Sequence, residues 1–497
     1  MILGYKVCGP KLGTTESRIE IQHMEKSSKL YVGVDVGGTK IQASLITASG
    51  SVIANNRQDT PRDSPIEPIL DAIEGCVAEL LQTRDMEFAD LATIGIAVPG
   101  VVEQDTGNVV VTPNMNLSGV ELGQIMGARF KVPVAIGNDC NLGTLGECWL
   151  GSGRMAKSCV GIFVGTGIGA GIVIDNQVFS GAGQAAGEIG HIVSRFPGVD
   201  WRTTLGAQER AGKTKLPPIP VLPRCGCGNY GCFETFASRT AMERFIREAV
   251  ADGSRSHIVE LCGGNLDVIK SGAIAKALKM NDKVVTSIVR YAAQVIGYAC
   301  LTVRHFFDPE VIVLGGGVIE ACHKFMMPVI DEVIASDQLH AAAGHRRILV
   351  SSLGDNAVVL GAVALARSMS GANPLRSNHQ VLPKYPKLKL QDDGVVNVNL
   401  IPFSDDFFLL ADGNVQLREK WPRKHPDGFR LADLKTATEG GTDLLILATP
   451  QAGSVPLSGK CRDFLLRRGI DHRILPLGEA VHAYNATMVR RSAVFHF

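Results

Sequence analysis

Two glycine-rich turns of the same kind, each following a predicted strand, constrain the fold of this chain most strongly. The first interrupts strand-like residues over positions 31–46, and the second interrupts a similar pattern over positions 159–174. Backbone N–H groups of glycine turns can approach a phosphate closely, and a threonine hydroxyl adds a donor. A single turn of this kind is more often a plain hairpin. The pair suggests an internal duplication whose two tips hold one polyphosphate from opposite sides, through Gly37, Gly38, Thr39, Lys40, Gly165, Thr166 and Gly167.

Acidic and amide residues end other predicted strands. Asp35 closes the strand before the first turn and could hold a hydrated magnesium ion. Asn138 and Asp139 follow a strand over residues 132–136 and precede a helix that reaches about residue 150. Ligands gather at the carboxyl ends of strands in open α/β sheets, so both side chains should face a cleft. Asp139 fits the N-cap of that helix equally well, and the residues alone leave both interpretations open.

Helices and strands alternate in both predicted halves, which indicates the α/β class. A buried strand is predicted over 91–98, and apolar residues at helical spacing predict helices over 66–81, 237–251, 285–303 and 357–368. The strand over 309–314 ends in Gly315, Gly316 and Gly317, and a flat base could lie against their backbone.

Three cysteines and a histidine have the spacing of a metal site. Cys225, Cys227 and Cys232 form a Cys-x-Cys-x4-Cys pattern, and His191 precedes them in the sequence. Three thiolates and one imidazole are a common ligand set of tetrahedral structural zinc. The alternative, a group of ordinary free cysteines, is disfavoured by three cysteines and three glycines within eight residues. We therefore predict a zinc site at these four residues.

Length, charge and cysteine usage exclude several classes of protein. A chain of 497 residues exceeds a single compact core, so two or three domains are expected. A net charge of +1 offers no strong field for nucleic acid or for an anionic membrane. The 12 cysteines are scattered apart from the cluster, which suits a reducing, cytoplasmic location. The first 28 residues have no long apolar run, so residues 1–29 are expected to be a disordered leader.

The composition changes after residue 370. Residues 371–396 are rich in Pro, Lys, Asn and Gln with little periodicity, and we interpret them as a linker. A separate small α/β domain is predicted over 397–497, with strands over 443–448, 472–475 and 493–497 and helices over 458–468 and 479–489.

Taken together, the motifs of the first 370 residues closely resemble those of the ROK family of sugar kinases and sugar-responsive repressors. The resemblance covers about residues 30–368 and includes every motif in order: Asp35-Val-Gly-Gly-Thr-Lys40, Asn138-Asp139, Val164 to Gly171, Glu188-Ile-Gly-His191, and Cys225 to Glu234. It implies a duplicated actin-like ATPase fold of the ribonuclease H-like type. Two lobes, about 30–140 and 141–370, would enclose a cleft.

The resemblance also implies a reaction and its residues. An ATP-dependent hexose kinase is expected, glucokinase-like, with N-acetylhexosamine, mannose or fructose as alternative acceptors. Asp139 would be the general base, magnesium would lie near Asp35, and Gly315 to Gly317 would accept adenosine. His191 would use one ring nitrogen for zinc and the other for sugar. The implied sugar ligands are Asn114, Asn138, Asp139, Glu188, His191 and Glu234, although Asn114 also fits a plain turn.

Two departures from the family pattern bear on the sugar. The 33 residues between His191 and Cys225 exceed the usual spacing and could form a lid or a subunit contact. Leu117 stands where many glucose-specific relatives carry an aromatic residue, which favours "hexose" over "glucose". Relatives are commonly dimers or tetramers, so a homodimer or homotetramer is expected.

Two other functions compete with the kinase. A sugar-sensing repressor would need a winged helix-turn-helix, for which about 30 residues before Tyr31 are too few. A non-catalytic scaffold would have no chemical need for Asp139 and both hairpins. Residues 397–497 resemble the complex I assembly factor three and adipogenesis-associated protein group, which implies a fold and an unknown partner. There Tyr484, Asn485 and Arg490 could line a small pocket or be packing and turn residues.

Overall fold

The computed structural model describes residues 29–113, 115–154, 156–193, 222–341, 347–376, 382–392, 394–418, 429–450, 457–487 and 489–497. Nearly all of the predicted leader and most of the insert between His191 and Cys225 lie outside these residues.

The first lobe is built on a five-stranded sheet of order β3-β2-β1-β4-β7. Strands β1 to β3 are antiparallel, whereas β4 and β7 continue the sheet parallel to β1. Val32 and Val34 point to helix α2, and Gly33 between them faces the opposite side of the sheet, as the two-residue period of a strand requires. The elements are β1 (Leu30–Val36), β2 (Lys40–Thr47), β3 (Val52–Asp59), α2 (Ile66–Gln82), η1 (Phe88–Asp90), β4 (Leu91–Val98), β5 (Val101–Glu103), β6 (Asn108–Val111), α3 (Leu122–Phe130) and β7 (Val134–Asn138).

The second lobe repeats this topology. Its sheet has the order β10-β9-β8-β11-β12, again with three antiparallel strands followed by two parallel ones. The predicted duplication is therefore confirmed. The elements are β8 (Ser158–Val164), β9 (Ile168–Ile174), β10 (Gln177–Val178), η2 (Ile189–His191), α6 (Glu234–Ala237), α7 (Arg239–Ala251), α8 (Ile258–Leu261), α9 (Ser271–Lys279), α10 (Lys283–Phe307), β11 (Val311–Gly315), α11 (Gly317–Ala335), α12 (Gln338–Ala341) and β12 (Arg347–Val350).

Helix α10 has the length and composition of a membrane span, and it is the one such helix among the described residues. However, 67% of its most apolar stretch is buried within the structure. Its buried side chains belong to the core of the second lobe, with those of α7 and α11. Its apolar character is thus explained by packing.

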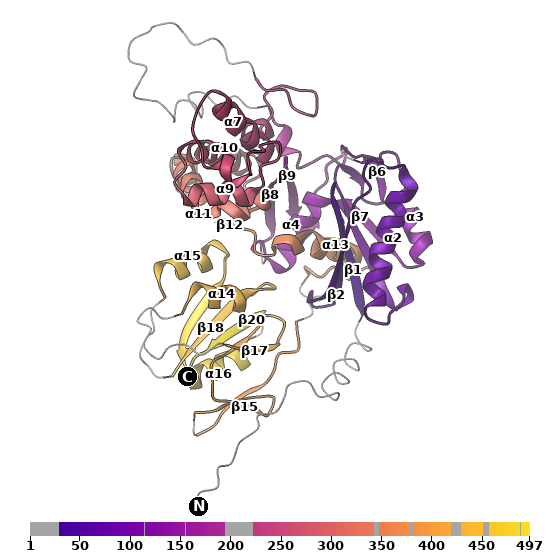
Figure 1. Cartoon of the computed structure of the whole chain (residues 1–497). Coiled ribbons are helices and arrows are strands. Elements are labelled where there is room, and N and C mark those ends of the chain that lie inside the picture. Colours follow the sequence, from indigo (N-terminus) through magenta and orange to yellow (C-terminus); the bar gives the residue numbers. More distant parts are fainter. Residues whose placement is uncertain are drawn as a thin grey trace, which may run out of the picture.

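Two helices lie between the sheets and join the lobes (Figure 1). They are α4 (Asp139–Leu150) and α13 (Ala357–Met369), the second preceded by η3 (Gly354–Asn356). Glycines let their backbones approach closely: a Cβ on Gly361 would collide with the Leu142 carbonyl oxygen, and one on Gly146 with that of Ala357. Gly33 of β1 gives α13 similar room against the first sheet. The two lobes therefore share one tightly packed pair of helices.

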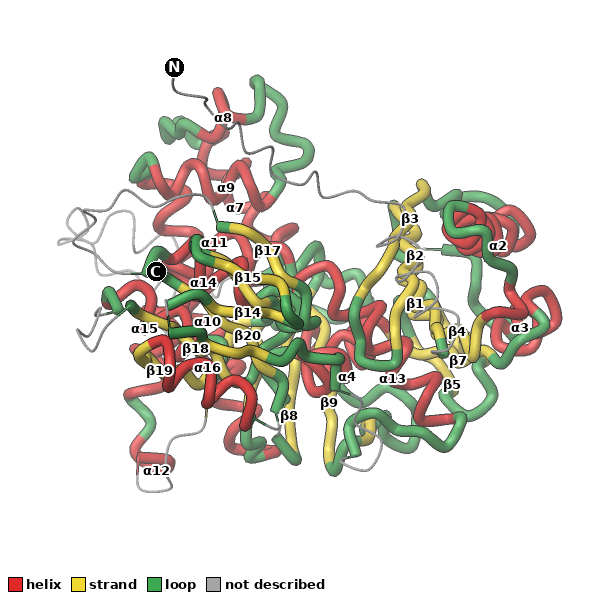
Figure 2. The backbone as a smooth tube through the Cα atoms, turned by 90° about the horizontal axis from the view of Figure 1, so that it is seen from below, coloured by secondary structure: helices red, strands yellow, loops and turns green. Residues whose placement is uncertain are grey.

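Residues after 381 form a third unit with two small sheets (Figure 2). The larger sheet has the order β17-β16-β20-β18-β19, and its two faces carry separate apolar clusters. Strand β13 lies inside the predicted linker and pairs with β14, because Leu388 and Val396 pack on that core. The elements are β13 (Leu388–Leu390), β14 (Val396–Val398), β15 (Ile401–Phe403), β16 (Phe407–Leu409), β17 (Val415–Leu417), α14 (Leu431–Thr438), β18 (Leu444–Thr449), α15 (Gly459–Arg467), β19 (Asp471–Pro476), α16 (Leu477–Ala486) and β20 (Arg491–Phe495).

Of the three residues in this unit that sequence left open, two are packing residues. Tyr484 is fully buried in the core, and the amide of Asn485 bonds both backbone groups of Leu388. Arg490 differs, because its Nη1 donates to the carbonyl oxygen of Ser49 in the first lobe, 2.8 Å away.

The contact between α4 and α13 provides a stability test. We expect Gly361→Ala to lower the free energy of unfolding by about 1–3 kcal/mol or more, because the added methyl group meets fixed backbone. Gly127→Ala on α3, where nothing lies within 4 Å of a new Cβ, should be neutral or stabilise by up to about 1 kcal/mol. Urea unfolding of both variants measures the difference, and equal effects would contradict the close packing.

Candidate active site

The first glycine hairpin forms as predicted between β1 and β2. The Gly37 N–H donates to the Lys40 carbonyl oxygen at 2.9 Å and closes the tip. Thr60, which directly follows β3, stabilises the tip: its hydroxyl donates to the Gly37 carbonyl oxygen at 2.7 Å. Thr39 and Lys40 are exposed. The tip is therefore held from behind while its side chains remain free to meet a ligand.

Asp35, one residue before the end of β1, lies in a crowded acidic environment. Burial raises the pKa of its carboxyl group to about 7, and the charges of Asp139 and Asp355 raise it further while Arg57 opposes them. Arg57 pairs with Asp355 at 2.9 Å. The carboxyl groups of Asp139 and Asp355 thus both act on Asp35, and Arg57 offsets part of their charge. A divalent cation beside Asp35 would relieve this repulsion, so these residues fit one.

Asn138 and Asp139 have different places at the start of α4. Asn138 is the N-cap: its Oδ1 accepts from the Asn141 N–H at 3.0 Å, and its Nδ2 donates to the Gly100 oxygen at 2.9 Å. The alternative in which Asp139 caps the helix is therefore wrong. Asp139 is the first helical residue, and its Oδ1 accepts from the adjacent Cys140 N–H at 2.8 Å. Burial raises the pKa of its carboxyl group, and Glu188 adds to the shift.

The second glycine hairpin joins β8 to β9. The Gly165 N–H donates to the Gly167 oxygen at 2.9 Å. Arg239, which sequence analysis missed, donates to the Thr166 hydroxyl at 2.8 Å, and Thr240 donates to the Thr166 carbonyl oxygen. Both come from the start of α7, directly after the cysteine cluster. The helix therefore braces this tip and adds a cation to it.

Gly315, Gly316 and Gly317 stand where β11 meets α11, beside the second hairpin. Gly316 has φ of 85° and is the N-cap of α11, and a Cβ there would lie 2.6 Å from the Val164 carbonyl oxygen. Gly315 packs on the Phe163 ring. Packing alone thus requires glycine at positions 315 and 316. Gly317 has the most space around it of the three.

The cysteine cluster assembles as predicted. One ligand atom from each of His191, Cys225, Cys227 and Cys232 lies within 4.8 Å of the others. The Cys227 and Cys232 sulfurs are 3.6 Å apart, close to the roughly 3.8 Å between thiolates of a tetrahedral zinc site. The Asn229 N–H lowers the pKa of Cys227 to about 7, which favours the thiolate. The four donors thus fit a tetrahedral metal ion.

His191 and Glu234 connect this cluster to the cleft. The Nδ1 of His191 lies 3.5 Å from the Cys225 sulfur, whereas its Nε2 faces Glu188 at 3.7 Å. Glu234 accepts from the Cys225 thiol with one oxygen and from the Ile168 N–H with the other, at 2.9 and 3.3 Å. The cluster therefore contacts both carboxylates, and Glu234 links it to Ile168 at the end of the second hairpin. Asn114, the remaining predicted sugar ligand, lies outside the described residues.

Sequence analysis also missed Asp355. Helix α13 is the counterpart of α4 in the duplicated fold, and Asp355 precedes it as Asp139 begins α4. Applying the duplication to the last helix would have identified this acid.

Comparison with known proteins identifies the family of this chain. The model of the ROK family matches residues 31–369. This chain belongs to the ROK family. The glucokinase of Halalkalibacterium halodurans is 31% identical over 340 residues, which cover 67% of this chain and 94% of that protein. The xylose repressor of Caldicellulosiruptor bescii is 31% identical over 341 residues, 68% of this chain and 78% of the repressor.

The structural comparison agrees. A ROK glucokinase from Streptomyces griseus, solved with glucose and AMPPNP, superposes with a TM-score of 0.56 at 28% identity, covering 68% of this chain and 99% of that one. The actin-like ATPase fold expected of a ROK protein is thereby confirmed. Both kinases and repressors of the family match the same part of this chain, so the fold alone does not choose between them.

Asp35 should give the free energy of unfolding a distinctive dependence on pH. Its pKa of about 7 exceeds its ordinary value of 3.8, so between these values the folded protein binds more protons than the unfolded chain. The free energy of unfolding therefore falls as pH rises through this range. We expect Asp35→Asn to be more stable than the unmodified protein at about pH 7.5, and the gain to vanish toward about pH 4.

Urea unfolding without nucleotide or divalent cation measures this profile. Asp59→Asn, which changes an exposed carboxylate of β3, is the matched control and should leave the profile unchanged. A gain that does not depend on pH would contradict the proposed crowding of Asp35.

Proposed function

We propose that this ROK protein transfers the γ-phosphoryl group of ATP to a hexose, with glucose as the first candidate acceptor and with Asp139 as general base. The observation that carries the proposal is the placement of Asp139. Its carboxyl group lies at the carboxyl end of β7, near Asp35 and Glu188, and burial raises its pKa, a direction that suits a general base. The kinship to glucokinases supports it.

Each group has a role in this reaction. The two hairpin tips bind and orient the phosphates from opposite lobes, and Gly317 is the most open of the three glycines assigned to adenosine. Asn138, Glu188, His191 and Glu234 hold the sugar hydroxyls, together with Asn114. Asp139 accepts the proton of the attacking hydroxyl. Magnesium held by Asp35 would neutralise charge on the phosphates, which phosphoryl transfer needs more than covalent help.

Zinc is proposed for the Cys/His cluster in a structural role. It would fix the loop that carries Glu234 and the ring of His191, and so act on sugar binding through position. The eleven described cysteines are all free, which agrees with a reducing, cytoplasmic location. A homodimer or homotetramer remains part of the proposal, as does the absence of nucleic-acid binding, since the net charge is only +1.

The first test is coupled ADP release with Mg-ATP and a panel of glucose, mannose, fructose, N-acetylglucosamine and N-acetylmannosamine. We expect turnover on at least one sugar, and Asp139→Asn should lower it by about 10²–10⁴-fold because it removes general-base catalysis. Calorimetry should show sugar binding retained in this variant. Glu332→Gln, which changes an exposed carboxylate near the C-terminal end of α11, serves as the control for loss of a carboxylate away from the reaction.

A protein that binds a sugar but turns none over would contradict the kinase proposal. In that case the sugar-sensing role known from the repressors that match the same region would take its place.

The zinc proposal has its own test. We expect Cys225→Ser to lose zinc, measured by elemental analysis of the purified protein, and to raise the KM for sugar because zinc would no longer fix the loop that carries Glu234 and the ring of His191. Cys262→Ser, which changes a free thiol outside the cluster, should keep one zinc per chain. Equal zinc contents in the two variants would refute this ligand set.

A further inference from the structure

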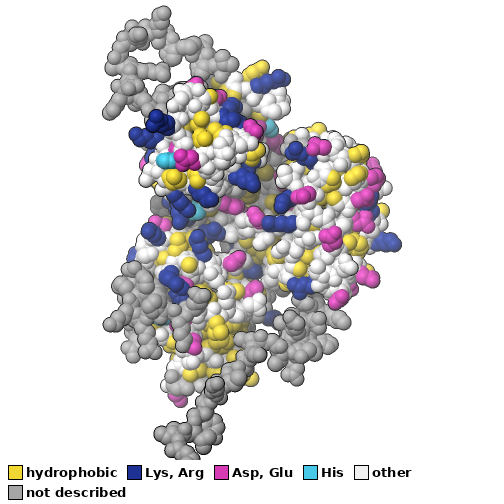
Figure 3. Space-filling view, viewed as in Figure 1, with side chains coloured by type: hydrophobic (Ala, Val, Ile, Leu, Met, Phe, Trp, Pro, Cys, Tyr) yellow, Lys and Arg dark blue, Asp and Glu magenta, His cyan; other side chains and the backbone are white. Residues whose placement is uncertain are grey.

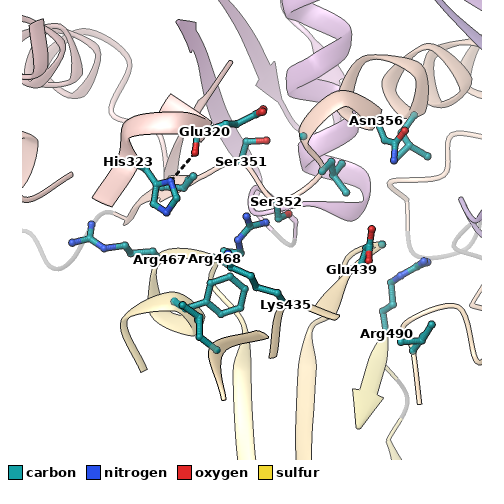
Figure 4. A pocket seen from close by; sticks show the side chains of 18 of the residues that line it. Glu320, His323, Ser351, Ser352, Asn356, Lys435, Glu439, Arg467, Arg468 and Arg490 are labelled. Atoms are coloured by element: carbon teal, nitrogen blue, oxygen red, sulfur yellow. Dashed lines mark hydrogen bonds between the residues drawn. The ribbon is translucent and has the colours of Figure 1, made fainter. Parts of the chain in front are cut away.

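A cavity of about 980 Å³ lies between the second lobe and the C-terminal unit. Its upper wall comes from α11 and from residues 350–356, and its lower wall from α14, α15 and Arg490 (Figure 4). The volume is within the range that accommodates a small-molecule ligand. None of the residues of the candidate active site named from the sequence lines it.

The two walls are held together by specific contacts. Besides the bond from Arg490 to Ser49, the buried Arg154 pairs with Asp443, and Arg467 pairs with Asp331 at 3.2 Å. A Cβ on Gly441 would collide with the Leu150 carbonyl oxygen at the end of α4. The cavity is therefore a fixed feature of the docked protein.

Positive charge dominates the lining, and Figure 3 shows Lys and Arg side chains on both sides of the hollow. Four Asp and Glu residues face six Lys and Arg residues: Lys324, Lys435, Lys460, Arg467, Arg468 and Arg490. Arg467 and Arg490 are occupied by the contacts above. The structure describes no ion pair for the other four. Over the whole lining, the Lys and Arg residues outnumber the Asp and Glu residues by two.

Among these cations, the position of Arg468 points most directly to a ligand in the cavity. It caps the end of α15 and lies over the Phe464 ring at 5.2 Å, and it points toward Ser352 of the opposite wall (Figure 4). Burial lowers the pKa of its guanidinium group while the charges of Glu147 and Glu320 raise it, and no hydrogen bond from this group is described. Across the cavity, burial and then the charges of Asp355 and Glu147 raise the pKa of the Glu320 carboxyl group, whereas Arg468 lowers it. A guanidinium group without a hydrogen-bonding partner offers several N–H donors in a planar fork, which an anion could accept.

We propose that this cavity binds the phosphate groups of a small phosphorylated molecule, held by Arg468 and Lys435 of the C-terminal unit against the segment 351–356. Phosphate matches several convergent Lys and Arg donors better than a single carboxylate does, because it offers more charge and more acceptor oxygens. The proposal does not depend on kinase activity.

The site would communicate with the active site. Asp355, whose charge acts on Asp35, stands between the lining residues Gly354 and Asn356. Glu320 lies one helical turn from Gly316, to whose carbonyl oxygen its N–H donates at 3.0 Å. A ligand in the cavity therefore touches both segments that the nucleotide side of the reaction would use. The ligand could be a nucleotide or a phosphorylated sugar, and both present the same phosphate chemistry.

The test is calorimetric titration of the full chain with ADP and, separately, with glucose 6-phosphate. Arg468→Gln and Lys435→Gln should each weaken binding of at least one of them by about tenfold or more, as expected for loss of a charge-assisted hydrogen bond. Arg473→Gln on β19, an exposed arginine outside the cavity, is the matched control and should change neither affinity. Unfolding curves verify that each variant is folded.

Each outcome decides the proposal. If the substitutions weaken binding of ADP alone, the ligand is a nucleotide. If they weaken binding of glucose 6-phosphate alone, the ligand is a phosphorylated sugar. If both folded variants bind both compounds as tightly as the unmodified protein, the proposal is overturned. Turnover does not enter this measurement, so its failure is distinct from failure of the kinase proposal.

Discussion

The close approach of α4 and α13 is the constraint on which the rest of the structure depends. Gly146 and Gly361 let each backbone pass against a carbonyl oxygen of the other helix, and side chains larger than hydrogen would force the helices apart. Glu147 reinforces the crossing: it is fully buried and accepts from the Ser351 hydroxyl at 2.6 Å and the Leu353 N–H at 3.1 Å. A buried carboxylate is tolerated because it is so fully bonded. The segment before α13 is thus tied to α4.

This crossing explains how carboxyl groups from distant parts of the chain come to repel one another. Asp139 begins α4 and Asp355 precedes α13, so fixing the two helices also fixes these acids beside Asp35. The carboxyl groups stay close together despite their repulsion, because the packing of α4 against α13 determines their positions. Such an arrangement raises the pKa of Asp35, and strongly shifted pKa values of this kind are a common feature of functional sites.

Much of this could be predicted from the sequence, and the failures have physical causes. Both hairpins, the duplicated halves and the four cysteine-cluster residues followed from local signals of spacing and turn chemistry. The cap of α4 did not, because Asn138 and Asp139 are both good caps and only the backbone shows which one precedes the helix. Arg57, Arg239 and Asp355 were missed because their roles depend on contacts between elements. Short strands such as β13 were missed because three residues carry no periodicity.

The C-terminal unit shows why a fused domain is hard to interpret from its own sequence. Arg490 and Arg468 look like surface residues of a small domain, yet one bonds the first lobe and the other faces a cavity closed by the second. Gly441 permits this contact only because it has no side chain against Leu150. Since Leu150 ends α4, the unit docks on the same helix that joins the two lobes. The C-terminal unit is therefore in direct contact with the C-terminal end of the helix that Asp139 begins.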